Sequence, residues 1–211
     1  KMLKQVALIT LLGMSASAMA GQWQVKVGAS ALAPQNDDNG TLDLTSKGLG
    51  YQKAVVSNEV NFTPSIEYIF DNSPLSVELL LAAPFKHDVD IGPFSEAASF
   101  KHLPPTITAK YNFKNSTRFT PYVGVGATVV VPWDEKLKND AAGLGKLDAD
   151  VAYGVAGQVG FNFQPADAKN WGVYADVRYA DVKTDLTLDG AKIGELEVNP
   201  WVYTLGYSYK F

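Results

Sequence analysis

His87 and His102 are the two histidines of this sequence, and histidine is the side chain best suited to acid–base chemistry near neutral pH. The stretch around them also carries a hydroxyl and several carboxylates: Asp88, Asp90, Ser95 and Glu96. Such residues build hydrolase triads and metal sites, but only in a geometry that spacing alone does not supply. They are equally the ordinary composition of a surface loop. We therefore predict no enzyme, no metal site and no bound cofactor.

Six charged residues form a second candidate group, because each of them stands between two apolar neighbours in the sequence. They are Lys26, Glu67, Glu78, Lys110, Asp176 and Arg178. In a strand, successive side chains point to opposite faces, so these charges would share a face that excludes their apolar neighbours. Charges on an enclosed face must pair or be hydrated. Since both signs are present, we predict a salt-bridged polar plug; a proton or ion relay is the alternative interpretation.

The same alternation runs through eight segments of the chain. They are 23–33, 60–70, 77–83, 106–113, 123–131, 151–163, 171–179 and 201–211. This pattern predicts an all-β fold, an eight-stranded antiparallel transmembrane β-barrel with its apolar face toward lipid. A soluble sandwich or lipocalin-like barrel, whose apolar face points inward, is the alternative. Aromatic residues at one end of nearly every segment, such as Phe113, Phe163 and Trp171, favour the membrane barrel with its interfacial belt.

The connections between these segments alternate in length. Residues 71–74, 114–118 and 164–170 are short and rich in turn formers, whereas 35–57, 84–102 and 132–147 are long. A fourth long connection is a hairpin extension around Asp189 and Gly190. Short turns at one end and long loops at the other are typical of outer-membrane barrels, with the short turns in the periplasm. Both histidines then fall in a long loop.

Near the long-loop end, the inward-facing residues change character from charged to apolar or small. They are Leu80, Ala82, Val130, Ala152, Ala156 and Val202. Eight strands enclose a space just wide enough for side chains, so we do not expect an open aqueous pore. An apolar ligand pocket above the polar plug is one interpretation of these residues, and ordinary tight packing is the other.

Residues 1–20 read as a secretory signal peptide, which leaves 21–211 as one mature domain. Lys1 and Lys4 precede a short apolar run, and small residues at Ala18 and Ala20 suit a signal peptidase. Without those two lysines, 16 of the 18 basic residues remain against 22 acidic ones, a net charge of about −6. That balance argues against a nucleic-acid partner, which requires a basic face.

Several motifs together resemble the outer membrane protein W (OmpW) family, which includes the alkane-uptake protein AlkL. They are PFKHDVDI (84–91), LPPTITAKYNF (103–113), PYVGVGATV (121–129), YADVRYADVKTD (174–185) and NPWVYTLGYSYKF (199–211). The loops at 35–57 and 132–147 match poorly. The resemblance implies a barrel with a hydrophobic channel that is open to the outside and closed below by packed side chains. It also implies that apolar molecules leave sideways, through a gap in the wall, into the membrane.

We therefore expect passive uptake of small hydrophobic molecules across the outer membrane of a Gram-negative bacterium. The alternative is a structural or surface-interaction barrel without transport, such as a phage or colicin receptor or a stress-protective protein. The partners expected are outer-membrane lipid and lipopolysaccharide, a small apolar solute and the barrel assembly machinery. The last of these would read the terminal aromatic residues Tyr207, Tyr209 and Phe211, which resemble its recognition signal.

Overall fold

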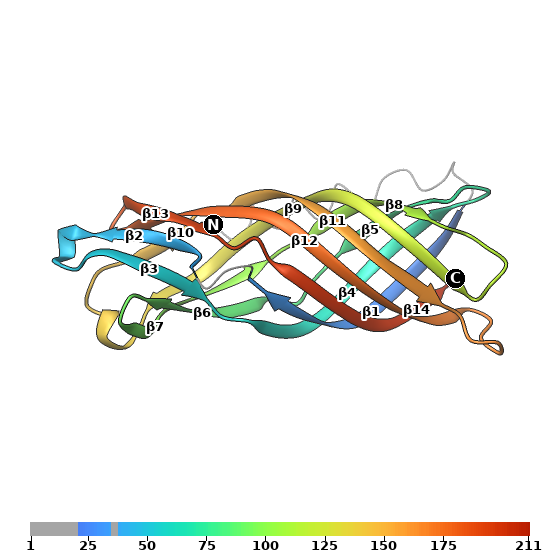
Figure 1. Cartoon of the computed structure of the whole chain (residues 1–211), viewed down its shortest axis with the longest axis horizontal. Coiled ribbons are helices and arrows are strands. Elements are labelled where there is room, and N and C mark those ends of the chain that lie inside the picture. Colours follow the sequence, from blue (N-terminus) through green and yellow to red (C-terminus); the bar gives the residue numbers. More distant parts are fainter. Residues whose placement is uncertain (1–20, 35–37) are drawn as a thin grey trace.

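The protein is an elongated β-barrel whose strands run obliquely to its long axis (Figure 1). The structure is a computed structural model that describes residues 21–34 and 38–211, so the expected signal peptide lies outside the described residues. Eight strands form the barrel: β1 (Gly21–Ala33), β4 (Glu59–Phe70), β5 (Leu75–Leu80), β8 (Thr106–Asn112), β9 (Phe119–Leu137), β11 (Ala152–Phe163), β12 (Trp171–Leu188) and β14 (Trp201–Lys210). Each pairs antiparallel with its neighbours in this order, and β14 pairs with β1 to close the ring. The predicted eight-stranded antiparallel barrel is confirmed.

The outer face of the barrel is apolar and its inner face is polar. In β14, Tyr203, Leu205 and Tyr207 are 51%, 68% and 62% exposed, whereas the alternating Thr204 and Ser208 are buried inside. The other barrel strands likewise expose apolar side chains on the outside and bury polar ones inside, and the buried side chains include lysines and glutamates. A soluble barrel would bury its apolar set, so the sandwich and lipocalin alternatives are excluded. Among the described residues there is no helix long and apolar enough to cross a membrane.

Beyond the apolar belt, the segments expected to be long loops fold into a strand-built extension. Its strands are β2 (Gly40–Leu44), β3 (Gly50–Val56), β6 (Phe85–Ile91), β7 (Phe94–Leu103), β10 (Leu147–Ala149) and β13 (Ala191–Glu197), joined by the far ends of β9 and β12. Two short 3-10 helices, η2 (Thr45–Lys47) and η3 (Asn139–Ala141), complete it. The expectation of surface loops is wrong for 38–57, 84–102 and 132–147, because these segments extend the hydrogen-bonded wall of the barrel instead of leaving it. The hairpin expected at Asp189 and Gly190 is confirmed, since Leu188 of β12 pairs with Ala191 of β13.

The burial pattern reverses in the extension, and this marks where the membrane-spanning part ends. Its outer face exposes charged side chains, among them Lys53, Lys86 and Lys183. Contact between a charged group and the lipid interior is unfavourable, so this face lies outside the membrane. Its interior is an apolar core. The residues of this core, hereafter the extension core, include Leu42, Val56, Ile91, Leu147, Leu188 and Ile193. The short turns 71–74, 114–118 and 164–170 lie at the opposite end of the barrel, hereafter the turn end.

Candidate functional site

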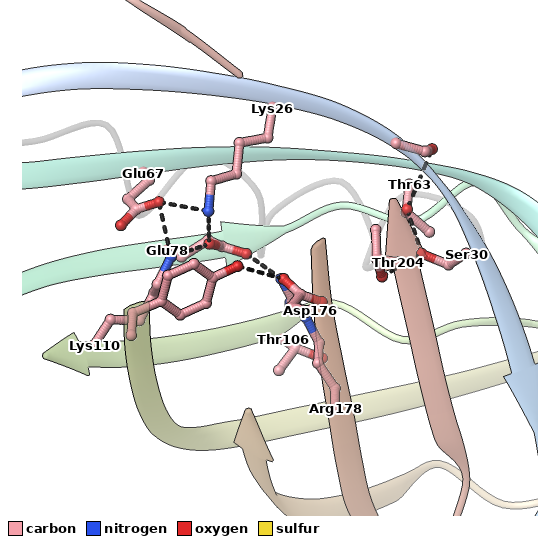
Figure 2. A network of polar contacts seen from close by, with 12 residues as sticks. Lys26, Ser30, Thr63, Glu67, Glu78, Thr106, Lys110, Asp176, Arg178 and Thr204 are labelled. Atoms are coloured by element: carbon pink, nitrogen blue, oxygen red, sulfur yellow. Dashed lines mark hydrogen bonds and ion pairs between the residues drawn. The ribbon is translucent and has the colours of Figure 1, made fainter. Parts of the chain in front are cut away.

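A network of buried ion pairs crosses the middle of the barrel (Figure 2). Lys26 Nζ lies 2.8 Å from carboxylate oxygens of both Glu67 and Glu78. Lys110 Nζ lies 2.9 Å from Glu67 and 2.8 Å from Glu78. These four side chains come from the four adjacent strands β1, β4, β5 and β8, and each is at most 1% exposed. Alternation therefore brings residues that are far apart in the sequence into one cluster.

Arg178 and Asp176, both on β12, join this cluster from the opposite wall. The Arg178 guanidinium donates to Glu78 and, at 3.1 Å, to Asp176. Tyr122 Oη donates to Asp176 at 2.9 Å, and Lys110 Nζ lies 3.8 Å from the centre of the Tyr122 ring. The six charged residues thus comprise three cations and three carboxylates, so the cluster is balanced. We call this network, with Tyr122, the polar plug.

The polar plug contains all six charged residues singled out from the sequence. Gly124 helps to make room for it, because a Cβ there would lie 3.0 Å from the Lys110 stem and 2.8 Å from Thr108. Tyr122 and Tyr174 were not among the residues that the sequence singled out for this site. Both are buried at inward positions, with Lys26 Nζ 4.9 Å from the centre of the Tyr174 ring. Their inward parity was the signal that could have found them.

Between the polar plug and the extension core lies an apolar cavity. Five of the six residues expected at an apolar pocket line it: Leu80, Ala82, Val130, Ala156 and Val202. The sixth, Ala152, is buried but is not among the lining residues. Arg178 of the polar plug borders the cavity at one end, and Leu186 and Leu196 of the extension core border it at the other.

The threonines of the cavity wall turn their hydroxyls to the protein rather than to the space. Thr63 Oγ1 lies 2.6 Å from Ser30 Oγ, and Thr184 Oγ1 donates to the Asp150 carbonyl at 2.7 Å. Thr106 donates to Thr128 at 2.9 Å, and Thr128 in turn donates to the Pro105 carbonyl. Each hydroxyl therefore has a partner within the wall, which leaves an apolar cavity surface.

The histidines were expected on a surface loop, and this expectation is wrong. His87 on β6 and His102 on β7 are buried, with their Nε2 atoms 3.0 Å apart. Inward parity in the β6–β7 hairpin brings them together, and Phe85 and Phe100 pack on their rings. Burial lowers the pKa of both, that of His102 to about 3. They are neutral at physiological pH, and only His102 lines the cavity.

The barrel wall beside the cavity has an interruption in its strand pairing. Between β5 and β8 the register ends at Leu80 opposite Thr106, and between β6 and β7 it resumes at Phe85 opposite His102. Residues 81–84 and 103–105 lie in between, and three of these seven residues are prolines, which have no N–H to donate. Ala82 and Pro104 from this interruption line the cavity. The two segments 81–84 and 103–105 therefore share no ladder pairs with each other next to the apolar space.

The extension core changes the expectation of a channel open to the outside. Its leucines, valines and isoleucines come from strands around the whole extension and pack against one another. Leu186 and Leu196 belong both to this core and to the cavity wall. In this structure the cavity thus lies between charges on one side and packed hydrocarbon on the other.

Comparison with known proteins identifies the relatives of this barrel. A model of the OmpW family matches residues 19–211. The chain belongs to the OmpW family. Over 203 residues it is 32% identical to outer membrane protein W of Vibrio cholerae, covering 90% of this chain and 89% of that relative. It is 28% identical to outer membrane protein AlkL of Ectopseudomonas oleovorans over 182 residues, covering 83% of this chain and 76% of that protein.

The solved structures agree with this assignment. The outer membrane protein OprG from Pseudomonas aeruginosa matches with a TM-score of 0.76 and 27% identity, covering 92% of this chain and 97% of that chain. As an OmpW family member, the protein is an eight-stranded transmembrane β-barrel of the bacterial outer membrane, in contact with its lipid. The family consists of outer-membrane barrels and is not known for enzymes. Within 21–34 and 38–211, no three His, Cys, Asp or Glu residues gather as a metal site.

Proposed function

We propose that this OmpW family protein takes up small hydrophobic molecules passively through the cavity and releases them sideways into the outer membrane. The observation that carries the proposal is an apolar cavity lying directly beside the interruption at 81–84 and 103–105. An apolar molecule in this cavity gains by avoiding water, and a route through the wall leads it from one apolar medium to another. The family resemblance points to the same class of solute.

The polar plug supports sideways release over passage toward the turn end. A molecule moving that way would have to separate Glu78 from Lys26, Lys110 and Arg178, all of which are buried. Breaking one buried ion pair costs about 3–5 kcal/mol. No such barrier arises from the prolines of the wall, since they contribute no N–H groups to strand pairing.

The test is uptake of an apolar fluorescent dye, N-phenyl-1-naphthylamine, by cells that express the protein, compared with cells that lack it. Leu80→Asp and Val130→Asp each insert a charge into the cavity, and we expect either to reduce the added uptake at least tenfold, since burying an unpaired carboxylate is strongly unfavourable. Tyr51→Asp is the matched control, because this side chain is 71% exposed on the extension. Gel mobility before and after boiling verifies that each variant is folded.

Uptake equal to that of cells without the protein would contradict transport and favour the structural or surface-interaction alternative. Uptake that Leu80→Asp and Val130→Asp leave at the parent rate would show that the cavity is not the route. Uptake that falls equally in Tyr51→Asp would mean that added charge itself is responsible.

A further inference from the structure

The outer face of the extension carries a group of basic side chains on the wall formed by β6, β7 and β9. Lys86 of β6 lies directly opposite Lys101 of β7, and Lys101 in turn lies opposite Trp133 of β9. The neighbouring pair, His102 and Pro132, lines the cavity, so alternation directs Lys101 and Trp133 outward. Lys86 shares their face, because directly opposed residues of an antiparallel pair project to the same side.

The two opposed lysines repel each other. Like charges directly opposite in an antiparallel pair are destabilising, since their Cβ atoms are only about 4.5–5.5 Å apart. Lys101 Nζ lies 2.9 Å from Asp134, but this carboxylate is shared with Lys136 Nζ at 2.6 Å. Lys86 is exposed and has no ion pair within 21–34 and 38–211. Three lysines thus share one carboxylate, and we call these four residues, with Trp133, the basic patch.

Other carboxylates near the basic patch do not neutralise it. Asp88, the next outward residue of β6, pairs with Lys138 at 2.6 Å, so these two charges cancel. Glu59 of β4 lies opposite a cavity-lining residue of β1, which places it on the inner face of the wall. Glu135 accepts a backbone N–H of β10. Asp90 lies at the hairpin tip, about 13 Å along β6 from the basic patch.

This excess of positive charge is local. The whole chain has a net charge of −4. The outer face of the β12–β13 wall carries two lysines and four carboxylates: Lys183, Lys192, Asp181, Asp185, Glu195 and Glu197. Each lysine there has a carboxylate of its own, Glu197 for Lys183 and Asp185 for Lys192. An anion at the outer face of the extension is therefore attracted to the β6–β7–β9 wall and repelled by the β12–β13 wall.

The basic patch begins where the apolar belt of the barrel ends. The next outward pair toward the barrel is Leu103 with Val131, and Val129 and Val125 follow along β9. No charged residue lies in β9 between its start and Trp133. Tryptophans at such a boundary sit at the level of the lipid headgroups. The lysines of the basic patch are therefore at headgroup height, with lipid-facing side chains directly below them.

A phosphate on a membrane lipid satisfies these features together. Its charge relieves the repulsion between the opposed lysines, and its oxygens accept charge-assisted hydrogen bonds from their ammonium groups. Its acyl chains lie against the apolar row below. A soluble anion would use the lysines and leave Trp133 and that row without a role. In the outer leaflet of the outer membrane the lipid with phosphates on its headgroup is lipopolysaccharide.

We infer that the basic patch binds a phosphate group of lipopolysaccharide between Lys86 and Lys101, with Lys136 beside it. The acyl chains then run along Leu103 and Val131. This inference is independent of the proposed function, although it places a lipid next to the interruption at 81–84 and 103–105.

The experiment titrates the mature chain in maltoside micelles, which contain no phosphate, with lipid A, the acylated and phosphorylated anchor of lipopolysaccharide. Dephosphorylated lipid A and inorganic phosphate are the comparison titrants. The indole N–H signal of Trp133, assigned with Trp133→Phe, reports binding beside Lys101. Lys86→Gln with Lys101→Gln removes two charges from the basic patch. Lys183→Gln with Lys192→Gln is the matched control, because it removes two charges from the acidic wall.

We expect the basic-patch double variant to bind lipid A about 30-fold more weakly than the parent, as for two lysines at a membrane surface. The control should stay within about twofold of the parent, and dephosphorylated lipid A should not distinguish the variants. Asp134→Asn removes the competing carboxylate and should tighten binding about fivefold. Its backbone φ of 59° suits asparagine as well as aspartate, so the fold is kept.

Equal lipid A binding by the basic-patch variant and the control would overturn the inference, as would equal binding of lipid A with and without its phosphates. If millimolar inorganic phosphate shifts the Trp133 signal and displaces lipid A, the basic patch is a site for soluble anions and the lipid assignment is wrong. Should the lysine variant not refold, the parent and Asp134→Asn decide: no preference for phosphorylated lipid A in the first, or no tightening in the second, refutes the inference. None of these outcomes bears on dye uptake.

Discussion

Neutralising Glu78 should be the most damaging single change in the barrel interior. Glu78 is fully buried and contacts Lys26, Lys110 and Arg178. Glu78→Gln keeps the side-chain shape but leaves three buried cations facing only Glu67 and Asp176. Removing one partner of a buried ion pair costs about 3–5 kcal/mol, and we expect a loss of that size in the free energy of unfolding.

A second substitution tests whether charge balance is the cause. Adding Lys110→Met to Glu78→Gln restores equal numbers of cations and carboxylates, so the double variant should be less destabilised than the sum of the single ones. We expect a coupling energy of about 1–3 kcal/mol. Asp71→Asn, in an exposed turn, is the control and should stay within about 0.5 kcal/mol of the parent.

The assay is urea unfolding of the barrel refolded into lipid vesicles, followed by tryptophan fluorescence and gel mobility. If Glu78→Gln unfolds within about 0.5 kcal/mol of the parent, the polar plug does not stabilise the barrel as its geometry implies. If the single effects simply add in the double variant, the loss comes from packing and not from unbalanced charge.

Three further predictions follow from other parts of the fold. Phe211→Ser should lower the amount of assembled barrel in the outer membrane, measured by gel mobility of membrane fractions, while refolding of the purified chain in detergent stays unchanged; equal assembly would contradict a role as assembly signal. NMR titration of the untagged chain should leave the His102 imidazole neutral down to about pH 5, and burial should lower the pKa of His87 below its usual range, although Glu59 and Asp88 act on it in the opposite direction. Because the pKa of His102 is lowered in the folded state, the unfolded state binds a proton first as the pH falls. The free energy of unfolding should therefore decrease between pH 6.5 and pH 3, by up to about 1.4 kcal/mol per pH unit. A titration midpoint of His102 near pH 6.5 would refute the burial of its imidazole. Replacing Pro104 and Pro105 by valine restores two N–H groups beside the cavity and should slow dye uptake up to about tenfold without weakening ligand binding.

The polar plug was predictable from the sequence because strand parity alone decides which side chains face inward. Lys26, Glu67 and Lys110 are far apart in the chain, but each stands between apolar neighbours, and the barrel must bring such residues to its interior. Strand parity does not tell how far along the barrel axis an inward-facing residue lies. It therefore predicted a pocket containing Ala152 as well as Ala156, although only Ala156 reaches the cavity.

Apart from the hairpin at Asp189 and Gly190, the extension was not predicted, and the reason is physical. In β6 the alternation is present, with Phe85, His87, Val89 and Ile91 inward, but the outward residues are charged and the inward set includes a histidine. A charge-rich stretch of this kind also suits a loop. Register shifts between Val89 and Ile91 in the β6–β7 pair and at Ser99 in the β7–β9 pair further break the period that sequence reasoning relies on. The histidine pair depends on contacts across this hairpin, so it was out of reach as well.

The two closures of the cavity differ in what it takes to open them, and this difference sets the direction of any passage. The polar plug is held by charges that have no water to replace their partners once they separate, so each lost pair costs about 3–5 kcal/mol. The extension core is held by apolar contacts, and an apolar molecule entering it replaces one hydrocarbon surface by another. The interruption at 81–84 and 103–105 has fewer strand bonds to break than the paired wall around it. A hydrophobic molecule should therefore enter through the extension and leave through the wall, and the polar plug should never need to open.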